Sequence, residues 1–203
     1  MKKSTVLEAA AKRFACKHYL DKPIEKDILT AILESARLAP TSFGMEMFDI
    51  HVSRSKDIID ACCWQESMKT APVTLVITVK KASCYDPDGD FVRSRGERFP
   101  GTIEEYVDDF RGYWEMMKRE GKLDMWAKAQ GYLPLSFMML TAAEYGVESC
   151  AIEGFDNDAL IRKLGLDGNE DQVSCCLALG YPDETRERIR RPLEDIVKYH
   201  GEF

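Results

Sequence analysis

The stretch WAKAQGYLPLSFMMLTAAEYGVESCAIEGF occupies residues 126–155 and is the part of the chain that most constrains its fold. Residues 126–145 carry almost no charge at their centre, which predicts a helix that is apolar around most of its circumference. Such a helix is buried on nearly every side, against its own domain or against a second copy of the chain. Another helix could approach closely at the small residues Gly131, Ser136, Ala142 and Ala143. Gly146 is the residue expected to end the helix.

Length and charge limit the classes of protein that this chain can represent. Its 203 residues suit a single domain, 1–203, with a substantial core. A net charge of −7 argues against nucleic acid or an anionic membrane surface as the main partner, because both attract positively charged proteins. The sequence also contains no run of about twenty apolar residues, the length that a membrane-spanning helix needs.

The cysteines indicate a reducing compartment. Seven cysteines, at positions 16, 62, 63, 84, 150, 175 and 176, form no Cys-x-x-Cys pair. Most of them lie in apolar runs, where cysteine packs as a small hydrophobic residue. Near the amino terminus, Glu8, Lys12 and Arg13 interrupt the apolar run that a signal peptide needs. We therefore expect a cytoplasmic protein with reduced thiols.

Hydrophobic periodicity predicts the remaining elements. Helical spacing covers residues 25–38, 55–68 and 103–117, and alternating or continuous β-branched residues predict strands at 48–52, 73–79 and 173–179. The strand at 73–79 is continuously apolar and is expected at the centre of a sheet. Residues 80–101 are expected to form a loop or the base of a cap. This order of elements indicates an α+β fold rather than the strict alternation of a doubly wound sheet.

The residue types that could carry chemistry favour anion binding. The three histidines form no metal-ligand cluster with the cysteines, and no Gly-x-Ser-x-Gly motif is present. If residues 13–18 are extended, Arg13 and Lys17 point to one face. Together with Arg188 and Arg190 near the other end of the chain, they could converge on a phosphate. The alternative is that all four are solvated surface charges.

Several motifs occur in order along the chain: RFACK at 13–17, APTSFGMEMF at 39–48, AIEGF at 151–155, GYP at 180–182 and RRP at 190–192. Together they resemble the nitroreductase family of FMN-dependent NAD(P)H oxidoreductases, in particular its oxygen-insensitive bacterial branch. The resemblance covers residues 6–197 and is weakest between 84 and 124. It implies an α+β fold in which a mixed sheet is sandwiched by helices, and an intertwined homodimer with two FMN sites at the interface. The long helix would then lie at the centre of the dimer.

The resemblance also implies which residues bind the cofactor. The basic residues would hold the flavin phosphate and pyrimidine edge, residues 40–44 would come from the partner subunit, and residues 153–154 would place backbone groups beside flavin N5. Gln65 would supply an amide contact to the pyrimidine. Carried over to this chain, the cofactor-binding positions are Arg13, Phe14, Ala15, Lys17, Pro40, Thr41, Ser42, Phe43, Gly44, Gln65, Ile152, Glu153, Gly154, Arg188 and Arg190.

The implied reaction is the reduction of a nitroaromatic or quinone-like small-molecule acceptor by NAD(P)H through FMN, in ping-pong turnover. A cation beside the flavin stabilises its reduced form. The flavin itself would reduce the acceptor, with protons drawn from water, so no side chain is assigned a catalytic role, and no metal is assigned. A variable cap at about 85–125 would cover the acceptor pocket. The alternatives are another reduction at the same flavin site, such as dehalogenation or flavin or pteridine reduction, and a flavin-binding dimeric scaffold without turnover. The chain departs from the family's pattern at Glu46, Met47, Phe48 and Trp64.

Overall fold

The computed structural model describes residues 5–54, 56–62 and 65–201 and contains one four-stranded sheet. The sheet order is β1-β2-β4-β3, and the three pairings between these strands are antiparallel. A parallel bridge between Ala15 and Ser149 adds an extended amino-terminal segment beside β3. The strands are β1 (Phe48–Ser53), β2 (Val73–Lys80), β3 (Glu148–Ile152) and β4 (Asp171–Gly180).

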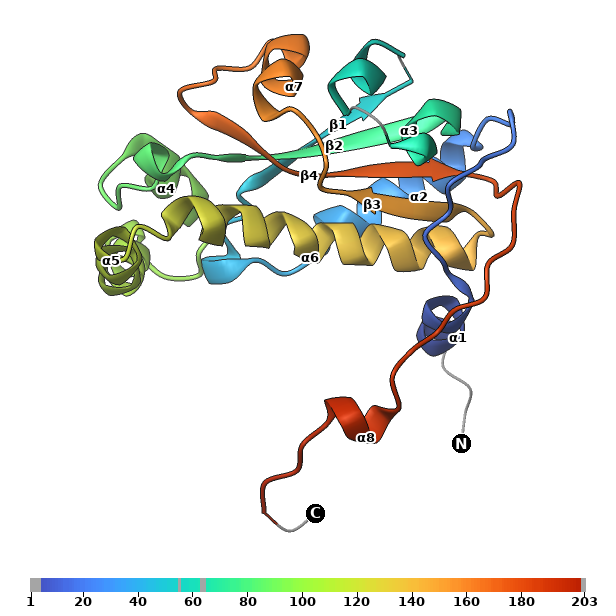
Figure 1. Ribbon diagram of the computed structural model, residues 1–203. Coiled ribbons are helices and arrows are strands. Elements are labelled where there is room, and N and C mark those ends of the chain that lie inside the picture. Colours follow the sequence, from blue (N-terminus) through green and yellow to red (C-terminus); the bar gives the residue numbers. More distant parts are fainter. Residues whose placement is uncertain (1–4, 55, 63–64, 202–203) are drawn as a thin grey trace.

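Helices cover both faces of the sheet, as Figure 1 shows. One face packs against α2 and α6, and the other packs against α7, α3 and the 3-10 segment η2. The α+β fold with a sheet sandwiched by helices is therefore confirmed. The helices are α1 (Thr5–Lys12), α2 (Lys26–Arg37), α3 (Glu66–Thr70), α4 (Asp90–Gly96), α5 (Ile103–Arg119), α6 (Leu123–Glu144), α7 (Asn157–Leu164) and α8 (Leu193–Ile196), with 3-10 segments η1 (Ser42–Gly44), η2 (Lys56–Cys62) and η3 (Ala82–Cys84).

The long helix α6 begins at Leu123 and includes the predicted apolar run. It ends, as expected, just before Gly146, which has a φ of 72°. Gly131 faces strand β4 rather than another helix, which corrects the expected role of this small residue. A Cβ built there would lie 2.7 Å from Ser174 Cβ, so only glycine permits this close approach. The Ser174 hydroxyl donates a 2.6 Å hydrogen bond to the Lys128 carbonyl and fastens the helix to the strand.

The two central strands are buried along their whole length. Every residue of β4 is buried, and β2 is buried up to Lys80 at its end. In β4 the side chains at 175, 177 and 179 pack toward α2 and α6, and those at 173, 176 and 178 pack toward α7 and η2. The central position predicted for residues 73–79 is confirmed. The alternating apolar residues at 173–179 do not indicate a solvent-exposed face of the strand, because helices cover both faces of the sheet.

Three segments differ from the sequence-based expectation. Residues 55–68 do not form one helix: η2 and α3 are separate, and Cys63 and Trp64 lie outside the described residues. Residues 80–101 contain the helix α4 as well as loops. In β1, Val52 is 46% exposed, so the predicted buried face of this edge strand is incomplete. Tertiary packing decides these three regions, because their local apolar pattern is weak.

The carboxyl-terminal residues leave the body of the molecule after Pro182, and Figure 1 shows α8 standing apart from the sheet and from α6. Large apolar side chains on this tail are exposed, including Ile189 at 85% and Leu193 at 68%. On α6, Leu133 and Phe137 are 38% and 40% exposed. Among the described residues, no helix combines the length and apolar character needed to cross a membrane.

Candidate functional site

Residues 13–17 run beside β3 as an extended segment. The Phe14 backbone N–H donates to Glu148 Oε2 at 3.1 Å, and the Cys16 N–H donates to the Ser149 carbonyl at 3.4 Å. Cys16 is fully buried, whereas Ala15 is exposed. The extended conformation that the alternation requires is therefore present, and it fixes the direction in which the basic side chains leave the backbone.

The two ends of the chain meet at a groove of about 270 Å³. We call it the basic groove, and its lining residues are Arg13, Phe14, Ala15, Lys17, Arg186, Glu187, Arg188, Ile189 and Arg190. All four predicted basic residues line it, so the structure brings them together. Arg186, which sequence reasoning did not assign, is a fifth cation at the groove. Its position two residues before Arg188 in an extended tail is the signal that could have identified it.

The cations of the basic groove differ in how their charge is compensated. Arg186 pairs with Glu184 at 2.9 Å. Arg188 and Arg190 donate to the backbone carbonyls of Ala10 and Ile189, at 3.3 and 2.9 Å. Bonds to neutral carbonyls hold these guanidinium groups without cancelling their charge. Arg188 and Arg190 therefore leave the groove positively charged and suited to an anion.

Arg13 and Lys17 are held from β3. Lys17 Nζ lies 3.0 Å from the Cys150 sulfur, and Arg13 Nε is buried without a hydrogen-bond partner among the described residues. Burial raises the pKa of the neighbouring Glu148 carboxyl, while the positive charges of Arg13 and Arg188 act in the opposite direction. The Arg13 guanidinium therefore has a donor that an anion in the groove could satisfy.

The predicted residues 152–154 lie at the end of β3, two to four residues after Cys150, the partner of Lys17. Ile152 is 2% exposed and packs in the core, which leaves only its backbone for a ligand. Glu153 Oε1 accepts a 2.5 Å hydrogen bond from the hydroxyl of Tyr132 on α6. Glu153 directly follows Ile152, the last residue of β3. Gly154 is next to it and half-buried.

The predicted loop 40–44 does not line the basic groove of its own chain. Its Ser42 backbone N–H donates to Gln130 Oε1 at 2.8 Å, and Phe43 packs edge-on against Phe110 at 5.1 Å between ring centroids. Phe43 has a φ of 56°, in the left-handed region that a non-glycine residue rarely adopts. Pro40 is exposed and Thr41 half-exposed; Gly44 follows with a φ of 59°. The loop is thus anchored on α5 and α6, apart from the groove.

Gln65 is not brought to the basic groove either. It is half-buried at the start of α3, and its side chain makes no capping hydrogen bond there. Its backbone carbonyl accepts from the Met68 N–H at 3.0 Å. The amide contact expected of Gln65 stays a prediction.

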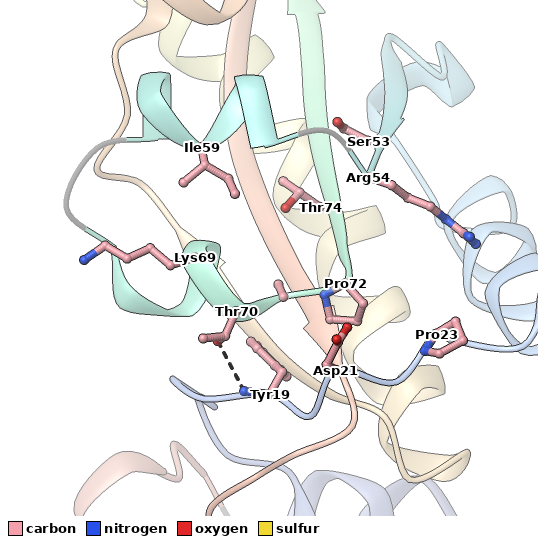
Figure 2. Close-up of a pocket in the computed structure, with 11 residues that line it drawn as sticks. Tyr19, Asp21, Pro23, Ser53, Arg54, Ile59, Lys69, Thr70, Pro72 and Thr74 are labelled. Carbon is pink, nitrogen blue, oxygen red and sulfur yellow. Dashed lines mark hydrogen bonds between the residues drawn. The ribbon is translucent and has the colours of Figure 1, made fainter.

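A larger cavity of about 450 Å³ opens between the start of β2 and the segment around Tyr19, and Figure 2 shows its lining. Its two basic side chains, Arg54 and Lys69, extend in opposite directions rather than toward a common point. Lys69 is paired with Glu66 at 2.8 Å, and Thr70 accepts from the Tyr19 N–H at 3.2 Å. None of the predicted site residues lines this cavity, so the basic groove is the stronger candidate site.

The fold and the basic groove together define an α+β protein with a groove suited to an anion. A model of the nitroreductase family matches residues 10–181 of the chain. A protein of Staphylococcus saprophyticus, provisionally named an NAD(P)H nitroreductase, is 32% identical and aligns with 96% of this chain and 96% of its own length. The chain belongs to the nitroreductase family, and the family expected from the sequence is confirmed.

Solved structures agree on the fold. A nitroreductase-like protein of Streptococcus mutans has a TM-score of 0.80 at 17% identity, covering 96% of this chain and 98% of its own. A nitroreductase-type protein of Exiguobacterium sibiricum, solved in complex with FMN, has a TM-score of 0.75 at 18% identity, covering 98% and 99% of the two chains. At these identities the similarity establishes the shared architecture.

Proposed function

We propose that this chain is an FMN-dependent oxidoreductase that uses NAD(P)H to reduce nitroaromatic or quinone-like acceptors. It works as a homodimer of single-domain subunits, residues 1–203, in which residues 85–125 cap the acceptor pocket. Free buried thiols such as Cys16, Cys175 and Cys176 are typical of a reducing compartment, which supports a cytoplasmic location. Family membership and the name of the staphylococcal relative support the enzyme class.

The convergence of Arg13, Lys17, Arg188 and Arg190 on one groove is the observation that carries this proposal. The residues fit a phosphate, because Arg13 Nε is a buried donor with no partner in the part of the chain that the structure describes, and a phosphate oxygen is a strong acceptor. Arg188 and Arg190 are already oriented by backbone carbonyls, so less side-chain freedom is lost on binding. Arg13, Arg188 and Arg190 would hold the FMN phosphate, with the backbone at Phe14 and Ala15 beside it.

Lys17 and the end of β3 would hold the redox-active part of the cofactor. Bound FMN supplies hydride acceptance from NAD(P)H and electron transfer to the acceptor. Lys17, held 3.0 Å from the Cys150 sulfur, would supply a cation that stabilises negative charge on the pyrimidine edge. Residues 152–154, at the end of β3, would contribute backbone groups to the same part of the cofactor. Donor and acceptor would use the open face in turn, which gives ping-pong kinetics.

A second copy of the chain completes the site in this proposal. Residues 40–44 lie on α5 and α6, apart from the basic groove of their own chain, so the groove would receive them from the partner subunit. Exposed apolar residues on α6 and on the tail, such as Phe137 and Leu193, would be covered by the same association. Hydrophobic burial of this kind stabilises obligate dimers.

The test is the visible absorption spectrum of the purified protein, followed by anaerobic addition of NADH and then NADPH. Oxidised flavin bands that are bleached by either nucleotide are the expected result, with reoxidation by a nitroaromatic or a quinone. Initial rates at several concentrations of both substrates should give parallel double-reciprocal lines. A colourless protein that takes up no added FMN would contradict the proposal.

The phosphate assignment has its own test in FMN affinity. Arg13→Ala and Arg188→Ala should each weaken FMN binding by about 1–3 kcal/mol, the value of a charge-assisted hydrogen bond, or roughly 5- to 150-fold in Kd. Arg191→Ala is the matched control, because Arg191 carries the same charge on the same tail but does not line the groove. Equal FMN affinity in all three variants would assign the phosphate elsewhere.

A further inference from the structure

A smaller cavity, separate from the two described above, lies between η1 and the loop that joins α4 to α5. Its volume is about 130 Å³, and we call it the arginine slot. Its lining residues are Phe43, Gly44, Arg95, Arg98, Phe99, Pro100 and Tyr106. No residue of the basic groove contributes to it, so the two are separate sites within one chain.

The arginine slot contains buried hydrogen-bonding groups that the described residues do not satisfy. Tyr106 is only 3% exposed, and its hydroxyl has no hydrogen-bond partner. Arg95 Nε is also buried without a partner. Burying such donors unpaired is unfavourable, and buried groups of this kind are generally satisfied by water or a ligand. Both residues line the same small cavity, so an acceptor bound there could satisfy these donors.

The charge of the slot is positive. Arg98 pairs with Glu46 at 3.0 Å, which compensates one of the two guanidinium charges and leaves that of Arg95. Burial raises the pKa of Tyr106 to about 12, and the positive charges of Arg98 and Arg95 both oppose this rise. Arg95, Arg98 and Tyr106 all line the slot, so one bound group could contact all three. A group with negatively charged oxygens satisfies all these donors together.

The walls of the slot are aromatic. Phe99 packs against Tyr106 at 5.5 Å between ring centroids. Phe43 also lines the slot, and its backbone φ is 56°. Such a strained conformation persists where surrounding structure enforces it and is common at ligand sites. Gly96 permits the close approach of Tyr106, because a Cβ there would lie 2.7 Å from Tyr106 Cδ1. An aromatic body with an anionic end matches both wall and donors.

We propose that the arginine slot binds the carboxylate of a small aromatic acid, with the Tyr106 hydroxyl, Arg95 and Arg98 as donors and Phe43 and Phe99 as walls. The slot is smaller than the roughly 300–1,000 Å³ typical of drug-sized ligand sites, which restricts it to a one-ring acid. Because Phe43 belongs to the loop assigned to the flavin site, the slot selects acceptors that carry a carboxylate. This last step rests on the proposed function, whereas the binding itself does not.

Calorimetric titration of the full-length protein with benzoate tests the binding. Benzoate should bind at least tenfold more tightly than benzamide, which has the same ring without the charge. Tyr106→Phe and Arg98→Gln should each weaken benzoate binding fivefold or more, and Tyr145→Phe should leave it unchanged, because Tyr145 lies outside the slot. Equal binding of benzoate and benzamide would overturn the proposal, as would binding of inorganic phosphate in preference to benzoate.

Glu46→Gln gives a test with the opposite sign. Removing the carboxylate that pairs with Arg98 raises the net positive charge of the slot, so benzoate should bind at least threefold more tightly. If the Arg98–Glu46 ion pair had only a structural role, Glu46→Gln would not increase the affinity for benzoate. Should Tyr106→Phe fail to fold, Glu46→Gln and Arg98→Gln still decide the outcome, because both side chains are about half exposed. Unchanged benzoate affinity in both would overturn the proposal.

Selection of acceptors that carry a carboxylate is tested by comparing kcat/KM for 4-nitrobenzoate and nitrobenzene. The wild-type protein should prefer 4-nitrobenzoate, and Arg98→Gln should reduce that preference at least fivefold. Benzoate binding in a protein that reduces neither compound would retain the slot and reject the proposed function. Reduction of both at equal efficiency, without benzoate binding, would retain the function and reject the slot.

Discussion

The hydroxyl of Tyr132 donates a 2.5 Å hydrogen bond to Glu153 Oε1 and joins the middle of α6 to the residue that follows β3. Burial raises the pKa of Tyr132 above its ordinary value, and the charge of Glu153 raises it further. The phenol is therefore a donor at neutral pH. This bond positions Glu153 and the neighbouring Gly154, whose backbone groups we assign to the cofactor.

Replacing Tyr132 with phenylalanine should remove that bond and retain the ring. We expect a loss of about 1 kcal/mol in the free energy of unfolding, the typical net value of a hydrogen bond that is partly open to water. Urea unfolding of the two proteins measures it. Tyr145→Phe is the matched control, because Tyr145 lies at the end of the same helix and is 50% exposed. A loss of equal size in both variants would contradict the role of the bond.

Gly131→Ala should force α6 away from β4. The added Cβ would lie 2.7 Å from Ser174 Cβ, and overpacking of this kind costs about 1–3 kcal/mol of unfolding free energy. Gly112→Ala is the control on α5, where a Cβ meets no atom within 4 Å. It should stabilise the protein by about 0.5–1 kcal/mol through helix propensity. Thermal unfolding of both variants checks this opposite pair of signs.

Glu148→Gln should change how stability depends on pH. The pKa of Glu148 is raised in the folded protein, mainly by burial, so ionisation of this carboxyl opposes folding. The contribution of Glu148 to stability is fully present below the ordinary carboxyl pKa of about 4.5, where the carboxyl is protonated. This contribution is lost as pH rises through the raised pKa of the folded protein. The wild-type protein should lose stability relative to Glu148→Gln across that window. Parallel denaturation profiles from pH 4 to 7 would show that Glu148 does not titrate this way.

Lys17→Gln should weaken binding of the reduced form of the proposed cofactor more than binding of its oxidised form. The variant removes the cation held 3.0 Å from the Cys150 sulfur, and a nearby positive charge favours the anionic reduced flavin. We expect a lower midpoint potential, measured by anaerobic titration against a reference dye. Lys12→Gln is the control, because Lys12 is exposed on α1 and does not line the basic groove. An unchanged potential in Lys17→Gln would place the lysine away from the ring.

Much of the fold could be predicted because its main signals are local. The run at 126–145, which carries almost no charge at its centre, predicted the long helix α6, and the β-branched run at 73–79 predicted a central strand. Burial of α6 on nearly every side is not seen in the single chain, where Leu133 and Phe137 are 38% and 40% exposed. The 85–101 region could not be predicted in the same way, since α4 has no long apolar stripe. The role of Gly131 also escaped sequence reasoning, because whether a small residue faces a helix or a strand depends on packing between distant segments.

The candidate site was also predicted only in part from the sequence. The sequence by itself determined that residues 13–17 could present two cations from one face of an extended segment, and that two arginines followed near the other end. Only the tertiary structure decided that Arg13 and Arg188 line one groove, because β3 holds the first segment and the chain returns beside it after β4. It likewise decided that Tyr106 and Arg98 share a slot with Phe43. Charge and periodicity are local properties of a sequence, whereas convergence depends on contacts between residues far apart in the chain, which packing of the whole core determines.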